Sequence, residues 1–262
     1  MKPRRPLGAI ATLVGVAGSL ACHHGARVQV APNPAAELVR ARTLIRQGDF
    51  GQAQIELRRL SYELTPTQPE MAEVKYDLAE CSFQTGDRVQ AAHDFRQVAD
   101  QFPSSPYAPL ALLRAGDANL RLWHDPELDP SYGESALAVY QELAGRYPGT
   151  DAAARAQLHV QTLREWFAEK DYKNGMFYFR RRAYDSAIIY FKDVIANYQG
   201  TPRVADALMR LVDSYRAIGY AEERKETCAT LRQYYPQTPG LDTACPAEAA
   251  PAPAPAPTRS PS

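Results

Sequence analysis

The sequence has few residues of the kinds that bind metals or perform catalysis. Its 262 residues include five histidines and four cysteines. The histidines are dispersed, and only His23 and His24 are adjacent. The sequence contains no glycine-rich phosphate loop, nucleophile elbow or Cys/His pairing. We therefore expect no metal, no cofactor and no catalytic residue, and we do not expect an enzyme.

The chain also lacks an excess of charge of one sign. Lysine and arginine together number 30, as do aspartate and glutamate, which gives a formal net charge of zero. A nucleic-acid-binding surface requires an excess of basic residues. We therefore expect no nucleic-acid partner. Many carboxylates lie four residues from a lysine or arginine, an arrangement typical of solvated helix faces.

Long apolar runs are confined to the N-terminus. Three basic residues, at positions 2, 4 and 5, precede an uncharged stretch from Leu7 to Leu20. This stretch is too short for a comfortable transmembrane helix and has the length of the apolar part of a signal peptide. The pattern predicts an exported protein.

The apolar stretch ends in Ser-Leu-Ala-Cys at residues 19–22, which resembles a bacterial lipobox. The resemblance implies a signal peptide over residues 1–21 and Cys22 as the lipidated, palmitate-bearing first residue. His23 follows at the place where lipoproteins retained in the inner membrane carry aspartate, so the resemblance favours the outer membrane. An ordinary secretory peptide is the alternative.

The three other cysteines match no metal-site spacing. Cys81 and Cys228 fall at apolar positions of expected helices, where we expect buried thiols. Cys245 lies further along, in the expected tail. A disulfide between Cys228 and Cys245 is the alternative, since an oxidising compartment would permit it.

Segments without helical periodicity flank the rest of the chain. Residues 22–34 are short and polar with two prolines near their end, and we expect a flexible tether. Residues 238–262 become rich in proline and alanine, and we expect a disordered tail. Helical periodicity covers residues 35–237, which we expect to form one domain.

An apolar pattern recurs five times within that domain. Each copy has residues at offsets 0, 4, 7 and 11, which share one face of a three-turn helix. The first slot is alanine in four copies, and a turn precedes each copy. The copies are Ala53-Leu57-Leu60-Leu64, Ala91-Phe95-Val98-Phe102, Ala136-Tyr140-Leu143-Tyr147, Ala187-Phe191-Val194-Tyr198 and Arg224-Cys228-Leu231-Tyr235. The pattern predicts an all-α, superhelical stack of about five tetratricopeptide-like helical hairpins.

One helix should be longer than the others. The alanine slots at Ala136 and Ala187 are 51 residues apart, against about 34 in a standard tetratricopeptide repeat. No proline occurs from Asp151 to Arg182. We expect one long helix shared by the third and fourth hairpins. Its apolar stripe breaks at Lys170–Gly175, which predicts a change of packing neighbours or a kink.

The region around the fourth copy carries a specific resemblance. The residues that carry it are Phe167, Ala168, Asp171, Phe177, Tyr178, Arg181, Ala183, Tyr184, Ala187, Val194 and Tyr198. With these residues the chain resembles the second half of the BamD family, the tetratricopeptide lipoproteins of the outer-membrane β-barrel assembly machine, and the likeness covers roughly Ala35 to Pro236.

The resemblance implies a scaffold, lipid-anchored in the outer membrane at its periplasmic face. Its C-terminal repeats would bind the barrel-forming assembly subunit, which has periplasmic domains. Its N-terminal repeats would bind unfolded outer-membrane protein segments, and other lipoproteins would be further partners. The alternatives are a tetratricopeptide cell-envelope adaptor of the Tol-Pal or peptidoglycan-synthesis type, and a periplasmic hydrolase with a helical accessory domain. Nothing outside the repeats could hold the active site of a hydrolase.

Candidate partner-binding residues lie at the end of the long helix. Arg180, Arg181 and Arg182 are placed where the helix dipole favours cations, and they would also suit an acidic partner. The resemblance puts Tyr190 where relatives often carry an arginine that faces the barrel-forming subunit. We expect these four residues to bind the partner.

Candidate substrate-groove residues lie on the first helices of the N-terminal hairpins. Tetratricopeptide stacks bind extended or helical peptides in a groove lined mainly by these helices. Tyr76, Arg114 and Asn119 are the residues we expect there.

Overall fold

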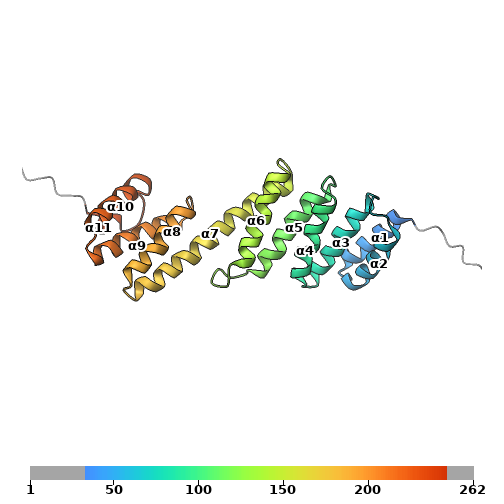
Figure 1. Cartoon of the computed structure of the whole chain (residues 1–262), viewed down its shortest axis with the longest axis horizontal. Coiled ribbons are helices and arrows are strands. Elements are labelled where there is room, and N and C mark those ends of the chain that lie inside the picture. Colours follow the sequence, from blue (N-terminus) through green and yellow to red (C-terminus); the bar gives the residue numbers. More distant parts are fainter. Residues whose placement is uncertain (1–32, 247–262) are drawn as a thin grey trace, which may run out of the picture. The chain divides into compact units, whose positions relative to one another are not determined.

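The computed structural model describes residues 33–246, which form eleven helices and no strand (Figure 1). The expected signal peptide, Cys22, the tether and most of the expected tail lie outside these residues. The helices are α1 (Pro34–Gln47), α2 (Phe50–Glu63), α3 (Glu70–Gln84), α4 (Arg88–Gln101), α5 (Tyr107–Leu122), α6 (Ser131–Arg146), α7 (Asp151–Arg180), α8 (Tyr184–Asn197), α9 (Arg203–Ile218), α10 (Ala221–Tyr234) and α11 (Leu241–Ala244).

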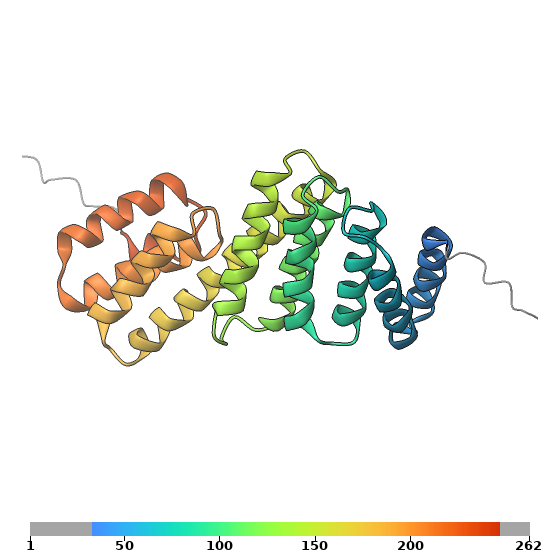
Figure 2. The same ribbon diagram turned by 45° about the vertical axis from the view of Figure 1, so that its right-hand side comes forward.

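The first ten helices pair into five hairpins, and the predicted all-α stack is confirmed. Each helix from α1 to α9 packs on the next one in the chain. The first helices of successive hairpins also pack on each other, in the order α1, α3, α5, α7 and α9, as Figure 1 and Figure 2 show. The four alanine slots are completely buried, because alanine lets neighbouring helices approach closely.

Three of the hairpins turn at a glycine. Gly48, Gly86 and Gly219 follow the first helices of the first, second and fifth hairpins, with φ of 81°, 94° and 80°. This left-handed conformation closes the end of a helix and is free of steric cost only for glycine. In the first and second hairpins, Asp49 and Asp87 then accept a hydrogen bond from the backbone N–H three residues on, which starts the next helix.

Each of the first four hairpins has a small buried residue on its first helix and a large buried residue at the matching place on its second helix. A Cβ atom on Gly116 would lie 2.4 Å from Cε1 of Tyr140, so only glycine fits there. The two partners are 16 residues apart in the sequence in the first, second and fourth hairpins. They are further apart in the third hairpin, because the loop between α5 and α6 is longer. The pairs are Ala41/Leu57, Ala79/Phe95, Gly116/Tyr140 and Gly175/Phe191. This pairing fixes how closely the helices of a hairpin approach.

The long helix α7 contributes to two separate cores. Leu163 and Phe167, in its first half, pack in the core formed mainly by α3 to α6. Tyr172, Met176 and Phe179, in its second half, pack with α8 and α9. The predicted change of neighbours is therefore confirmed, and the 30-residue helix runs without interruption through the stretch where its stripe breaks.

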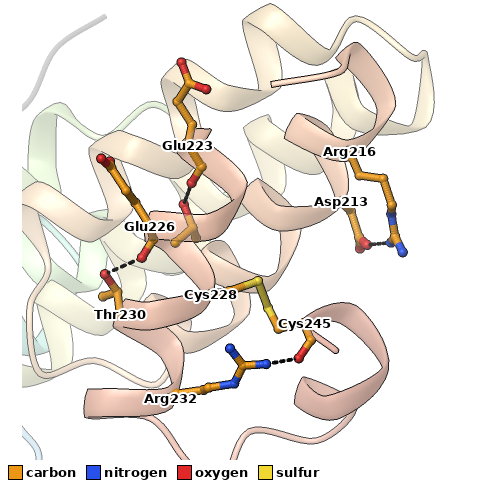
Figure 3. The surroundings of a disulfide bond; sticks show 9 residues. Asp213, Arg216, Glu223, Glu226, Cys228, Thr230, Arg232 and Cys245 are labelled. Atoms are coloured by element: carbon orange, nitrogen blue, oxygen red, sulfur yellow. Dashed lines mark hydrogen bonds and ion pairs between the residues drawn. A yellow bond between two sulfur atoms is a disulfide. The ribbon is translucent and has the colours of Figure 1, made fainter. Parts of the chain in front are cut away.

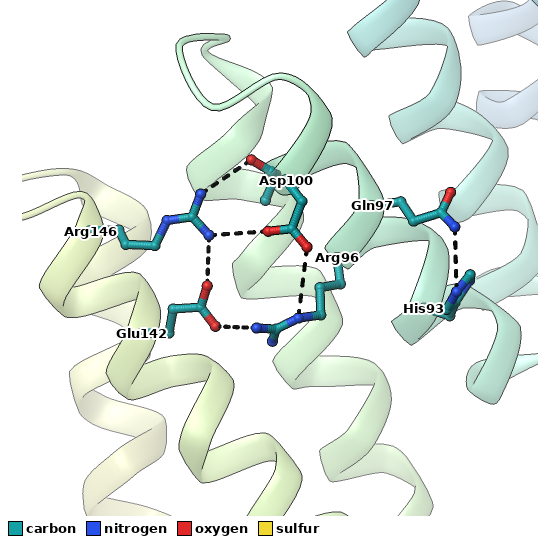
Figure 4. A network of polar contacts seen from close by, with 7 residues as sticks. His93, Arg96, Gln97, Asp100, Glu142 and Arg146 are labelled. Carbon is teal, nitrogen blue, oxygen red and sulfur yellow. Dashed lines mark hydrogen bonds and ion pairs between the residues drawn. The ribbon is translucent and has the colours of Figure 1, made fainter.

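An ion-pair network on the surface joins the second and third hairpins (Figure 4). Arg96 of α4 lies 2.7 Å from Glu142 of α6, and Arg146 lies 2.6 Å from Glu142 and 3.3 Å from Asp100. Burial opposes the charge of Glu142, but hydrogen bonds from Arg146 and Arg96 outweigh it and lower the pKa of Glu142. The network adds a polar link between the two hairpins.

The C-terminal segment differs from the prediction. Residues 238–246, expected to begin a disordered tail, contain α11, and Leu241 is buried against the fifth hairpin. Cys245 forms a disulfide with Cys228, so the expectation of a free thiol at Cys228 is wrong (Figure 3). Four residues are too few to reveal a helical period. Cys81 is a buried free thiol as expected, and burial raises its pKa to about 12.

Candidate interaction surfaces

A pocket of about 430 Å³ lies on the first helices of the second, third and fourth hairpins. This is the face where the repeat pattern predicts a groove; we refer to it as the groove pocket. Its walls combine apolar, basic and acidic side chains. They are Phe83, Arg114, Asp117, Leu120, Arg121, His124, Arg155, His159 and Trp166.

Arg114 is held in place in the groove pocket by two carboxylates and a ring. Its guanidinium donates to Glu80 at 2.6 and 2.8 Å and to Asp117 at 3.1 Å. It also lies 4.0 Å from the centroid of Phe83. Burial opposes its charge, but the bonds to Glu80 and Asp117 raise the pKa of Arg114. The charge of Arg114 is thus neutralised by its own neighbours.

A buried tyrosine contacts two residues that line the groove pocket, Asp117 and His159. The Tyr140 hydroxyl donates to Asp117 over 2.8 Å, and the His159 ring stacks on Tyr140 at 4.9 Å. Burial, followed by the charge of Asp117, raises the pKa of Tyr140. Tyr140 therefore stays a neutral donor that fixes one oxygen of Asp117.

Of the three predicted groove residues, only Arg114 lines the pocket. Tyr76 packs between Phe95 and Tyr107, with ring centroids 5.3 and 5.4 Å away, and burial raises its pKa to about 12. The side-chain amide of Asn119 donates to the Ala115 carbonyl of its own helix at 3.0 Å. The structure places Tyr76 and Asn119 in contacts within the stack.

Two exposed arginines of the groove pocket were not among the predicted groove residues. Arg121 and Arg155 line it, and within residues 33–246 neither has a carboxylate within the 4.0 Å of an ion pair. In the sequence they look like ordinary solvated arginines. Their position on α5 and α7, first helices of adjacent hairpins, is the signal that could have placed them there.

A second pocket, of about 540 Å³, lies where the end of α7 meets α8 and the α5–α6 loop. We refer to it as the C-terminal pocket. It includes two of the four predicted partner-binding residues. It is lined by Glu127, Lys170, Lys173, Asn174, Phe177, Tyr178, Arg180 and Tyr190.

Stacked aromatic rings form one wall of the C-terminal pocket. Tyr178 and Tyr190 stack at 5.4 Å with an interplanar angle of 12°, and Phe177 meets Tyr178 edge-on at 5.2 Å. The guanidinium carbon of Arg181 lies 3.6 Å from the centroid of Phe177. Phe177 is nevertheless 44% exposed. Burial and Tyr178 raise the pKa of Tyr190. The wall offers rings and a cation to a partner.

The α5–α6 loop contributes Glu127 to the lining of the C-terminal pocket. Lys170 donates to the Leu128 carbonyl at 2.8 Å, and Lys173 pairs with Glu127 at 2.5 Å. Trp123, at the start of the loop, is buried against Phe167 with ring centroids 4.6 Å apart. The polar insertion of the third repeat is thereby fixed against α7.

Arg182 occupies an unusual backbone conformation beside this pocket. Its φ is 61°, and it is the single non-glycine residue with positive φ within residues 33–246. Its N–H donates to the Phe179 carbonyl and that of Ala183 to the Tyr178 carbonyl, at 2.9 and 3.1 Å, which closes α7. The equivalent turns of three other hairpins use glycine. A left-handed non-glycine residue costs about 1–2 kcal/mol, and such strain is concentrated at functional sites.

The arginines at this turn are available to a partner. Arg180, Arg181 and Arg182 are all exposed. In the described part of the chain, none of them has a carboxylate within ion-pair distance. Three cations and an exposed ring therefore lie together without an acidic partner of their own.

Comparison with known proteins gives a consistent result. Residues 34–231 match the model of a family described as "YfiO: Outer membrane lipoprotein". A Caulobacter vibrioides protein named "Outer membrane protein assembly factor BamD" is 31% identical over 147 residues, which cover 56% of this chain and 48% of that protein. A protein of the same name from Neisseria meningitidis serogroup A is 27% identical, and the alignment covers 60% of this chain and 62% of that protein. Another from Xylella fastidiosa strain 9a5c is 22% identical, and the alignment covers 88% of this chain and 82% of that protein.

The alignment thus spans about half of the Caulobacter relative and under two thirds of the Neisseria relative. Among solved structures, a thermophilic tetratricopeptide protein of Thermus thermophilus is 20% identical, with a TM-score of 0.37 over 80% of this chain and 96% of that one.

Between residues 33 and 246, no helix combines the length and apolar character needed to cross a bilayer.

Proposed function

Since the family model covers residues 34–231, the chain belongs to the YfiO family of outer membrane lipoproteins, and we propose that it is a scaffold for outer-membrane protein assembly. Curated relatives named as assembly factors support this proposal. The proposed location is the periplasmic face of the outer membrane, with a lipid anchor at Cys22. The proposed role is non-enzymatic, because the aromatic rings and cations of the two pockets are suited to binding a partner.

The C-terminal pocket and its arginines are the proposed binding surface for the barrel-forming subunit. The observation that carries this assignment is Arg182, kept in a conformation that glycine would adopt at lower energy. Arg180 and Arg181 add two exposed cations, and Phe177 adds an apolar ring. Arginine and aromatic side chains dominate interface hot spots. The partner surface should be acidic, with at least one apolar side chain to cover Phe177.

The groove pocket is the proposed binding site for unfolded outer-membrane protein segments. Phe83, Leu120 and Trp166 offer an apolar wall, and Arg121 and Arg155 offer exposed cations. Such a groove suits an extended peptide that carries both apolar side chains and a carboxylate. Arg114 and Asp117, already paired with each other, would fix the shape of the groove.

Co-purification of the barrel-forming subunit tests the first surface. The double variant Arg180→Ala/Arg182→Ala should lower recovery about tenfold or more, because hot-spot arginines contribute at least about 1–2 kcal/mol each. The control Arg46→Ala/Arg58→Ala removes the same charge from exposed sites on the first hairpin. Equal recovery with both double variants would exclude this surface.

Depletion of the protein tests the process itself. A fall in the level of many β-barrel proteins of the outer membrane supports the assembly role. Normal barrel levels together with a septation or cell-wall defect would instead point to the envelope-adaptor alternative.

A further inference from the structure

The fifth hairpin reverses the size rule that the other four obey. In the first four, a small buried residue of the first helix matches a large buried residue of the second, as Gly175 matches Phe191. In the fifth, Val212 occupies the small position and Cys228 the large one, with the same separation of 16 residues. Both lie in one buried cluster. Cysteine is much smaller than phenylalanine, tyrosine or leucine.

The second helix of this hairpin is also poorly apolar. The buried residues of α10 are Thr227, Cys228 and Leu231. The corresponding helix of the fourth hairpin buries four apolar residues, including a phenylalanine. Burial of apolar area is the main stabilising contribution to such packing. The fifth hairpin therefore begins with a weaker core than its neighbours.

The α11 segment supplies what is missing. Leu241 and Cys245 are 7% and 2% exposed and lie in the same cluster as Val212 and Cys228. The backbone carbonyl of Cys245 accepts a hydrogen bond from Arg232 of α10 (Figure 3). The disulfide joins Cys245 to Cys228, 17 residues earlier. Side chains from beyond the repeat thus join the buried cluster that contains Val212 and Cys228.

We propose that the fifth hairpin is an oxidation-dependent element, completed only when the Cys228–Cys245 disulfide fixes α11 against it. This inference does not rest on the proposed function. It predicts that the C-terminal end of the stack matures in an oxidising compartment, because structural disulfides persist there and are rare in the cytosol.

The bond would form by exchange with a disulfide of an oxidant. One cysteine thiolate attacks the oxidant's S–S bond, and the other resolves the mixed disulfide. The oxidant leaves as a dithiol that carries the two electrons and two protons of the cysteines. A pocket of about 460 Å³ beside the disulfide, lined by Arg224 and Arg232 among others, gives access to this position. Nearby cations favour the reactive thiolate.

Hydrogen exchange of the full chain, oxidised and reduced, tests the proposal. A disulfide between cysteines 17 residues apart contributes about 3 kcal/mol, so protection of residues 221–245 should fall on the order of 100-fold on reduction. Residues 34–197 should keep their protection. Alkylation of the same two samples provides an internal control: the buried thiol of Cys81 should resist the reagent in both states. Equal protection of residues 221–245 in both states would overturn the proposal, and loss across the whole chain would overturn its restriction to the fifth hairpin.

Two variants separate the packing from the bond. Cys245→Ser should reproduce the loss without reductant. In that background, Val212→Ala/Cys228→Phe restores the size rule of the other hairpins and should recover protection of α10 in both redox states. If Cys245→Ser lowers protection but the restored pair recovers none of it, the packing explanation is wrong. The reduced wild-type chain gives a readout that does not depend on any variant folding.

Discussion

Gly175 and Phe191 touch without a side chain between them: a Cβ atom on Gly175 would lie 2.6 Å from Cε1 of the ring. Gly175→Ala should therefore force α7 and α8 apart and lower the free energy of unfolding by about 1–3 kcal/mol. Denaturant unfolding measures this. The matched control is Gly145→Ala in α6, where an added Cβ meets nothing within 4 Å. It should raise stability by up to about 1 kcal/mol through helix propensity. Equal effects would show that the contact is not tight.

Arg182→Gly should separate stability from binding. It relieves the left-handed strain at φ 61° and should raise the free energy of unfolding by about 1 kcal/mol. It also removes an exposed cation beside the C-terminal pocket, so binding of the proposed partner, the barrel-forming subunit, should weaken. Thermal unfolding and co-purification measure the two effects. A variant with higher stability and unchanged binding would leave Arg182 without a role in the partner contact.

Arg114→Met should destabilise the groove pocket. It leaves Glu80 and Asp117 with side chains only 17% and 16% exposed and without their cation. The expected loss is roughly 2 kcal/mol, since unpaired partly buried carboxylates are costly. Arg121→Met, at an exposed arginine of the same pocket, should change stability by less than about 0.5 kcal/mol. Similar losses in both variants, measured by urea unfolding, would contradict the importance of the Arg114 pairing.

The network around Glu142 should make stability depend on pH. The pKa of Glu142 lies below its usual 4.5 in the folded state, so the folded chain binds the proton less readily than the unfolded chain. The stabilisation is present above pH 4.5 and is lost as the pH falls through the lowered pKa. Because the pairs lie at the surface, the loss should stay below about 1 kcal/mol.

Urea unfolding between about pH 7 and about pH 3 compares the wild type with Glu142→Gln. The variant should be less stable at neutral pH and approach the wild type at the acidic end. High salt should narrow the difference, because it screens exposed ion pairs. A difference that does not change with pH would show that the carboxylate charge is not responsible.

Lys170→Met should loosen the α5–α6 loop. It removes the bond to the Leu128 carbonyl while it keeps the apolar stem. Hydrogen exchange within residues 124–130 should rise several-fold, with global stability changed by less than about 0.5 kcal/mol. Lys192→Met, on α8, is the control and should leave the loop unaffected. If the loop exchanges at the wild-type rate, Trp123 alone is sufficient to hold it.

Much of the fold could be predicted because repetition reveals it. Residues such as Ala53, Ala91 and Phe95 fall on one helical face in each copy, and that face is the one that is buried. The fifth copy was harder to read, because Arg224 and Cys228 replace its usual alanine and large residue. The short helix α11 has too few residues to show any period.

The candidate sites could be predicted only in part. Periodicity identifies the groove face. It cannot tell which polar side chains on that face already hydrogen-bond to their own helix, as Asn119 does to the Ala115 carbonyl. The left-handed turn at Arg182 carried a usable signal, since Gly48 and Gly86 occupy the same place in other hairpins. The disulfide could not be derived, because the sequence does not reveal that the chain after α10 folds back over Cys228.

Helix α7 is long enough to contribute residues to both pockets. Its 30 residues span about 45 Å. Arg155 and His159, near one end, line the groove pocket, while Phe177 and Arg180, at the other, line the C-terminal pocket. A tilt of about 10° around its middle would move either end by about 4 Å. A ligand that tilts α7 at one pocket would therefore also shift the residues that line the other pocket.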